Sequence, residues 1–202
     1  MFNLIRKDIV MQKKTLAILA LALCVYLALG VSSIWVGLIF SIVMITNTFS
    51  LDEKSNVHML LNSLPYTRKQ IVSSKYVVAV LFTLLVALAL FVGNLVFHGE
   101  ITLWKHLLIM MILVFIAASF ILPFSYQYKS QYLFVASIVA FGAYMLLVNT
   151  LIPNLNDLIR EKVYIILTTT TPSLYVGMVV LVGCLYGFSW IVSIRIYEKK
   201  VF

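Results

Sequence analysis

The side chains able to carry catalytic or metal chemistry are few and do not group along the chain. His58, His98 and His106 fall in separate segments without the spacing of metal ligands. Cys24 and Cys184 both lie inside apolar runs, where a buried small hydrophobic side chain is the expected role. Neither a nucleophile with its base nor the G-x-x-x-x-G-K-S/T phosphate loop is visible. We therefore expect no enzymatic activity and no catalytic, metal or cofactor site in this chain.

The apolar runs hold only mild polar groups. No Asp, Glu, Lys or Arg lies inside the six apolar runs, two of which make up residues 15–51 and the others residues 76–97, 107–128, 132–152 and 173–194. This argues against proton-coupled transport, because such carriers usually need charged residues near mid-membrane. Asn47, Asn94 and Asn149 lie within three of the runs. Their favoured role is hydrogen bonding between helices, worth roughly 0.6–2 kcal/mol each; the alternative is that they line a path for an amphipathic substrate. Gly183 and Gly187 form a G-x-x-x-G, where a second copy or another helix of the subunit could approach closely.

One polar stretch, residues 51–76, carries a helical pattern of its own. Ser50 and Glu53 have the S-x-x-E spacing of a capping box and predict that a helix starts here. Pro65 disfavours helical geometry at the preceding residue and ends this helix. Between them, apolar residues recur at i, i+3, i+4 and i+7 as one stripe: Val57, Leu60, Leu61 and Leu64.

This short helix has two interpretations. It is either an ordinary interfacial helix whose leucines rest on the lipid headgroups, or a docking helix that offers its polar face to a cytoplasmic partner. Thr67 and Gln70 repeat the capping spacing and open the next helix. The predicted partner-docking residues are Asp52, Glu53, Val57, Leu60, Leu61, Leu64 and Arg68.

The composition excludes an ordinary soluble domain. Hydrophobic residues make up 63% of the chain and charged residues 11%, against about 45–50% and about 25% in typical soluble domains. The formal charge is +8, but the basic residues flank apolar runs and do not form a patch with interleaved aromatics. The lipid bilayer is therefore the expected partner, and nucleic acid is not.

The apolar runs predict an all-α polytopic membrane protein with six transmembrane helices in a single domain, residues 1–202. Residues 15–51 contain no charged side chain and are about twice the roughly 20 residues that one crossing needs, so they form two spans with a turn at 30–33. The predicted segments are an amphipathic interfacial helix at 1–14, spans 1 and 2 at 15–51, the polar helix and corner at 52–70, span 3 at 71–97, span 4 at 107–128, span 5 at 132–152, a partly helical, re-entrant outer segment at 153–172, and span 6 at 173–194.

The basic residues predict the orientation. Six crossings put both termini on one side, and the lysines of the first helix are expected to point towards anionic lipid. Twelve basic residues then fall on the side of the termini: Arg6, Lys7, Lys13, Lys14, Lys54, Arg68, Lys69, Lys75, Lys129, Arg195, Lys199 and Lys200. Three fall on the other side: Lys105, Arg160 and Lys162. The positive-inside rule therefore places the termini and the polar helix in the cytoplasm, with the protein in the cell membrane.

The layout resembles the membrane subunit of type-2 ABC transporters, in their small-permease branch. Both have an amphipathic N-terminal helix, six crossings and a cytoplasmic helix between the second and third. Residues 52–54 (DEK), 60–65 (LLNSLP), 67–72 (TRKQIV) and 74–76 (SKY) are similar to that branch's acidic pair, its L-x-S-L-P corner, its T-R-x-x-I-V and its closing S-K-Y. The layout match covers the whole chain, whereas the motif covers about 51–76.

The resemblance implies that residues 52–64 act as a coupling helix. This helix would dock in a groove of a separate ATP-binding subunit, which would hold ATP and Mg²⁺. Two membrane subunits, identical or related, and two ATPase subunits would form the working unit. Residues 153–172 would match the outer re-entrant helices of the family.

The cargo is constrained only by class. The lack of buried charge and the 13% aromatic content fit export of an amphipathic peptide or a lipid-like substrate. Within its branch, the chain is similar to Gram-positive exporters of amphipathic peptides such as phenol-soluble modulins. The alternative is a non-transporting immunity or sensory subunit that holds a cytoplasmic partner with the same helix, which the missing polar pathway favours.

Overall fold

The structure is a computed structural model that describes residues 2–29, 32–54, 66–99, 103–128, 155–168 and 172–199, with the single positions 132, 135, 139, 143 and 146. All regular structure in these residues is helical, which confirms the predicted all-α class. The seven helices are α1 (Phe2–Met11), α2 (Lys13–Ala28), α3 (Ser33–Lys54), α5 (Arg68–His98), α6 (Trp104–Gln127), α8 (Leu155–Thr168) and α9 (Pro172–Lys199).

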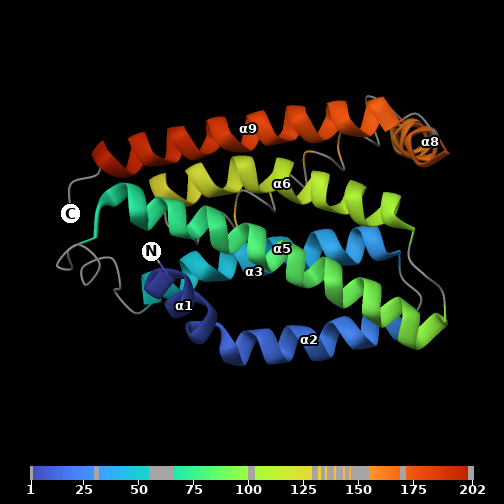
Figure 1. The fold of residues 1–202 in the computed structure, drawn as a ribbon, viewed down its shortest axis with the longest axis horizontal. Coiled ribbons are helices and arrows are strands. Elements are labelled where there is room, and N and C mark those ends of the chain that lie inside the picture. Colours follow the sequence, from blue (N-terminus) through green and yellow to red (C-terminus); the bar gives the residue numbers. More distant parts are fainter. Residues whose placement is uncertain are drawn as a thin grey trace.

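The long helices form an elongated bundle. Figure 1 shows α3, α5, α6 and α9 running roughly along the long axis of the molecule. α6 packs against α9 and α3, while α5 packs against α3 and α9. α1 and α2 both pack against α5, and α2 also packs against α3. Both chain termini lie at the end of the bundle where α3 ends and α5 begins, and α8 lies across the opposite end (Figure 1).

Four helices of the described residues are long and apolar enough to cross a membrane: α3, α5, α6 and α9. The 16-residue α2 is about 24 Å long, and together with α1 it would make a fifth span, bent by 60°. These helices correspond to the predicted spans 1, 2, 3, 4 and 6. The predicted span 5, residues 132–152, lies mostly outside the described residues.

The break between the first two spans lies where the sequence predicted it, since α2 ends at Ala28 and α3 begins at Ser33. The predicted helix start at Ser50 is wrong, because α3 continues through Ser50 to Lys54. A capping box needs a chain that enters the helix from an extended residue. Here Asp52 forms ion pairs with lysines of neighbouring helices, so α3 can continue through this charged residue without leaving it unpaired.

The N-terminal helix is shorter than the predicted 1–14. It ends at Met11, and the chain bends at Gln12 before α2 starts at Lys13. The predicted exposure of every lysine to lipid is also wrong, because Lys7 is turned towards the protein and pairs with carboxylates there.

The predicted start of span 3 is confirmed as a capping box. The Thr67 hydroxyl oxygen accepts a hydrogen bond from the backbone N–H of Gln70, and the Gln70 side-chain oxygen accepts one from the N–H of Thr67. Because this box closes at Arg68, span 3 begins before the predicted residue 71. It ends at His98, followed by Gly99 with φ of 67°, a left-handed conformation that glycine adopts without a steric penalty.

The second half of the chain follows the predicted order. α6 passes through Pro123 and continues to Gln127. The predicted outer segment at 153–172 contains α8, and the Tyr175 hydroxyl at the start of α9 donates to the carbonyl of Ile166 in α8 over 2.6 Å. α9 extends beyond the predicted 173–194, to Lys199.

Gly37 lies at a close contact between helices, whereas the glycines of the predicted G-x-x-x-G do not. A Cβ at Gly183 or Gly187 would meet no atom within 4 Å, so neither glycine permits close packing within the described part of the subunit. By contrast, a Cβ at Gly37 would lie 2.7 Å from Cδ1 of Leu90 and 2.8 Å from Cγ of Met110. Both of these side chains are fully buried, so they have little room to move away.

We therefore expect Gly37→Ala to destabilise the protein by about 1–3 kcal/mol, the usual cost of overpacking. Gly177→Ala is the matched control, because Gly177 is also inside a helix but has open space around it. Both changes gain the same helix propensity, so the difference between their unfolding temperatures in mild detergent isolates the packing term. Equal unfolding temperatures would show that α3 does not pack closely against α5 and α6.

Candidate functional site

A cluster of four buried charges joins three helices at the end of the bundle that holds the termini. Lys7 Nζ lies 3.1 Å from Asp8 Oδ1 and 2.8 Å from Asp52 Oδ1. Lys75 Nζ lies 2.9 Å from Asp8 Oδ1 and 2.5 Å from Asp52 Oδ2. Each lysine therefore meets both aspartates. The side chains of Asp8, Asp52 and Lys75 are at most 4% exposed, and that of Lys7 is 24% exposed. We call these four residues the ion-pair cluster.

The ion-pair cluster is electrically balanced, with two positive and two negative charges. Moving a lone charge out of water costs several kcal/mol, and removing one partner of a buried pair typically destabilises a protein by about 3–5 kcal/mol. For Lys7, burial disfavours the charged ammonium, but the carboxylates of Asp8 and Asp52 outweigh burial and raise the pKa of Lys7 above its usual value. The cluster therefore fixes α1 against α3 and α5 through charges that depend on one another.

A second polar contact joins the bend between α1 and α2 to α3. The Gln12 side-chain Nε2 donates to Thr48 Oγ1 over 2.6 Å and to the Met44 carbonyl over 3.3 Å. Lys75 Nζ of α5 also lies 5.6 Å from the centre of the Phe49 ring of α3, in cation–π range. α3 is thus joined to its neighbours at this end of the bundle by charge, hydrogen bonds and an aromatic ring.

The predicted docking residues do not share one surface. Asp52 is 1% exposed and belongs to the ion-pair cluster, so it does not contact a docked partner directly in this conformation. Glu53 is half-buried at the end of α3. Arg68 donates to the carbonyls of Tyr197 and Glu198 at 3.1 and 2.7 Å, which joins the start of α5 to the end of α9. The stripe of Val57, Leu60, Leu61 and Leu64 lies outside the described residues.

The sequence analysis missed Lys7, Asp8 and Lys75 as members of a site. One signal was available, because Asp8 is the only acidic residue before Asp52 and stands among basic and apolar residues. A lone carboxylate in such a helix needs a cation nearby when it is buried. Its partner Lys75 is 67 positions away, and no pattern of spacing predicts that pairing.

A hydrogen-bonded seam of hydroxyl groups joins α5, α6 and α9 next to the ion-pair cluster. The Tyr76 hydroxyl lies 2.8 Å from Ser189 Oγ and 2.7 Å from Ser193 Oγ. Ser189 donates to the carbonyl of Ser119 in α6 over 2.7 Å. The Tyr186 hydroxyl donates to the backbone carbonyl of Tyr76 over 2.8 Å. Such bonds stabilise helix association in an apolar medium by roughly 0.6–2 kcal/mol each.

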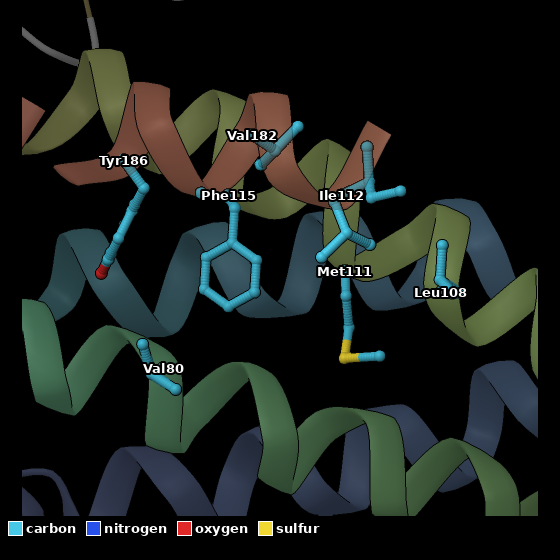
Figure 2. Close-up of a pocket in the computed structure, with 9 residues that line it drawn as sticks. Val80, Leu108, Met111, Ile112, Phe115, Val182 and Tyr186 are labelled. Carbon is cyan, nitrogen blue, oxygen red and sulfur yellow. The ribbon is translucent and has the colours of Figure 1, made fainter. Parts of the chain in front are cut away.

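A cavity of about 330 Å³ lies beside this seam, between α5, α6 and α9. Figure 2 shows side chains from the three helices around it. Because the Tyr186 hydroxyl is committed to Tyr76, this tyrosine offers mainly its ring, which packs edge-on against Phe115 at 5.3 Å between centroids. The cavity can therefore hold an apolar group but offers no charge. The lining residues are Val80, Leu108, Met111, Ile112, Phe115, Val179, Val182, Gly183 and Tyr186.

Asn47 and Asn94, two of the three asparagines considered for a substrate path, do not line this cavity. The Asn94 amide donates to Ser33 Oγ over 2.9 Å, a bond between α5 and α3 that agrees with the favoured role in helix association. Asn47 Nδ2 has no hydrogen-bond partner among the described groups, and Asn149 lies outside them. The predicted burial of Cys24 and Cys184 is wrong, since both are exposed, on α2 and α9. No group of three or more His, Cys, Asp or Glu in the described residues could hold a metal ion.

The fold and the site define a multi-pass α-helical membrane protein with a charged joint at one end and an apolar cavity between its spans. Residues 3–198 match the family model described as ABC-2 family transporter protein. Because the match covers nearly the whole chain, the chain belongs to this family. It is thus a permease subunit of an ABC transporter, a membrane transport subunit of a class that is generally not catalytic itself and that works with an ABC ATPase. No curated protein and no solved structure matches the chain.

The ion-pair cluster gives a specific expectation for stability. Asp8→Asn leaves two lysines with one carboxylate and should cost about 3–5 kcal/mol. Adding Lys75→Met restores the charge balance, so the double variant should be destabilised by clearly less than the two single changes together. Denaturant unfolding of the four proteins in mild detergent measures this coupling.

Asp157→Asn is the control, because Asp157 is an exposed acid on α8 at the other end of the bundle. It should change the free energy of unfolding by less than about 0.5 kcal/mol. Strictly additive effects of Asp8→Asn and Lys75→Met would contradict the cluster as a unit.

Proposed function

We propose that this permease subunit couples ATP hydrolysis by a separate ABC ATPase to the export of an amphipathic peptide or a lipid-like substrate. The observation that carries the proposal is the ion-pair cluster, which fixes α1, α3 and α5 together at the place where the predicted coupling segment leaves α3 and enters α5. Residues 52–64 are the coupling segment in this proposal. ATP and Mg²⁺ are bound by the partner subunit.

The contacts support transmission from this segment into the membrane. A network of buried ion pairs does not deform gradually, because separating one pair leaves an uncompensated charge. A displacement of the chain between Lys54 and Thr67 therefore moves α1, α3 and α5 as one body. Lys75 is followed directly in α5 by Tyr76, whose carbonyl accepts the hydrogen bond from Tyr186, a residue of the cavity wall. A continuous series of contacts thus connects the coupling segment with the cavity.

The cavity supports the class of substrate. Its lining is apolar and its volume lies at the lower end of the range of ligand pockets, about 300–1,000 Å³. Such a site takes a branched or aromatic side chain, or a short length of acyl chain, but not a charged group. An amphipathic molecule can place its apolar part there and leave its polar part outside, which is why we propose this class rather than a sugar or an ion.

The distribution of basic residues supports cytoplasmic termini in the cell membrane. The starts of α1, α2 and α5 and the end of α9 lie at one end of the bundle (Figure 1). In the described helices, basic residues at that end far outnumber the three at the other end, Lys105, Arg160 and Lys162. By the positive-inside rule this end faces the cytoplasm, where the ATPase is. A second membrane subunit, identical or related, completes the proposed transporter.

Leu60→Asp with Leu61→Asp tests the coupling segment. In the purified complex with its ATPase, this double variant should lose transport of a fluorescent amphipathic peptide into proteoliposomes, because the apolar stripe can no longer pack. Basal ATP hydrolysis by the ATPase should persist.

Leu158→Asp with Ile165→Asp makes the same change at exposed positions of α8 and should transport like the wild type. Normal transport by the Leu60 and Leu61 variant in an intact complex would rule out coupling through this segment. If no ATPase copurifies with the wild type, the immunity or sensory role replaces transport.

The cavity is tested by filling it. Gly183→Trp places an indole in the cavity, whereas Gly177→Trp makes the same change on the same helix at a glycine that does not line the cavity; a Cβ at either position meets no atom within 4 Å. Excluding one buried apolar side chain of the substrate loses about 1.5–3 kcal/mol, so the apparent affinity for the peptide should fall about tenfold or more in the Gly183 variant. Peptide-stimulated ATP hydrolysis measures that affinity. Equal affinities in the two variants would show that the substrate does not use this cavity.

A further inference from the structure

The two faces of α1 are reversed relative to a helix on a soluble protein. Asp8 of α1 and Gln12, directly after its end, are turned inwards and are at most 2% exposed. The apolar residues Phe2, Ile9 and Val10 are turned outwards and are 78%, 41% and 59% exposed. Exposing three large apolar side chains to water would cost several kcal/mol. The outer face of α1 is therefore built to contact lipid.

The charges on this outer face have one sign. Lys7 is drawn inwards by the ion-pair cluster, and Asp8, the one acidic residue of α1 and α2, is buried in the same cluster. Arg6 remains exposed on α1, and Lys13 and Lys14 remain exposed at the start of α2, directly after the 60° bend. Three cations thus surround an apolar surface without an acid beside them on these two helices.

The apolar surface is hollowed. A depression of about 340 Å³ is lined by Phe2, Ile5, Arg6, Ile9 and Val10, so a guanidinium stands at the rim of an otherwise apolar hollow. Residues 2, 6 and 9 follow one another on the same face of α1 at a spacing of three or four. Lys13 and Lys14 follow Val10, the last lining residue, by three and four positions, beyond the bend.

We propose that the outer face of α1 binds an anionic phospholipid of the inner leaflet. The lipid phosphate lies between Arg6 and the pair Lys13 and Lys14, and an acyl chain lies along the hollow. The argument rests on charge complementarity, because three cations without an acid favour a headgroup with net negative charge over a zwitterionic one. The acid-free surface is that of α1 and α2, whose one acidic residue, Asp8, is buried. The proposal also rests on shape, since an apolar hollow beside a guanidinium matches a chain attached to a phosphate. This inference does not depend on the coupling segment or on the cavity.

The test compares the lipids that remain bound to the protein. The full chain is reconstituted in vesicles of phosphatidylcholine with an equal amount of phosphatidylglycerol of the same acyl chains, then extracted in mild detergent. Mass spectrometry gives the ratio of the two bound lipids. The wild type should be enriched in phosphatidylglycerol, because each basic residue near the membrane surface adds about 1 kcal/mol, or about fivefold, to binding of an anionic lipid.

Two triple variants separate a site from a general effect of positive charge. Arg6→Gln, Lys13→Gln and Lys14→Gln should reduce the enrichment by about fivefold or more. Lys69→Gln, Arg195→Gln and Lys199→Gln remove the same charge from exposed positions of α5 and α9 at the same end of the bundle and should keep it. Phe2→Ser with Val10→Ser should lower the amounts of both bound lipids without reversing their ratio.

Two results would overturn the proposal. One is a wild-type ratio equal to that of the vesicles, which would mean that α1 does not select the headgroup. The other is an equal loss of enrichment in both triple variants, which would mean that only the total charge at this end of the bundle matters. Because these measurements use no ATP and no ATPase, their failure would leave the proposed export function untouched.

Discussion

The central constraint in this protein is that charges placed in an apolar interior need opposite charges beside them. Asp52 and Lys75 belong to helices that are otherwise spans, and both are almost completely buried. Each could be tolerated only with a partner, and together with Asp8 and Lys7 of α1 they form a balanced set. The position of α1 follows from this requirement, because Lys7 and Asp8 of this helix complete the set.

Between the ion-pair cluster and the cavity, the interacting groups become less polar. The charges of the cluster come first, then the hydroxyl groups that join Tyr76 with Ser189 and Ser193, and then the apolar lining of the cavity. Each zone uses an interaction that its surroundings permit, since hydroxyl groups can pair in an apolar medium at a far lower cost than charges. Tyr76 connects all three groups. It follows Lys75 of the cluster in the sequence, its hydroxyl bonds with the two serines, and its carbonyl accepts a hydrogen bond from Tyr186 of the cavity wall.

Membership of the ABC-2 family gives this gradient a functional setting. In the function proposed above, a separate ATPase acts on the coupling segment and the substrate is held between the spans. The ion-pair cluster then lies beside the coupling segment, and the apolar cavity is the proposed place for the substrate. α1 contributes its inner face to the cluster and its outer face to the surrounding lipid, so one short helix connects the bilayer with the proposed coupling segment.

The sequence by itself determined the features that depend on neighbouring residues. The uncharged run of residues 15–51 is too long for one crossing and is divided near residues 30–33 into α2 and α3, and the pair Thr67 and Gln70 starts a helix where predicted. Only the tertiary structure decided that Asp52 lies within a cluster rather than on a docking surface, and that Gly37 rather than Gly183 permits close packing. The physical reason is that capping and hydrophobic length act within a few residues, whereas an ion pair such as Lys75 with Asp8 joins residues brought together only when the helices pack.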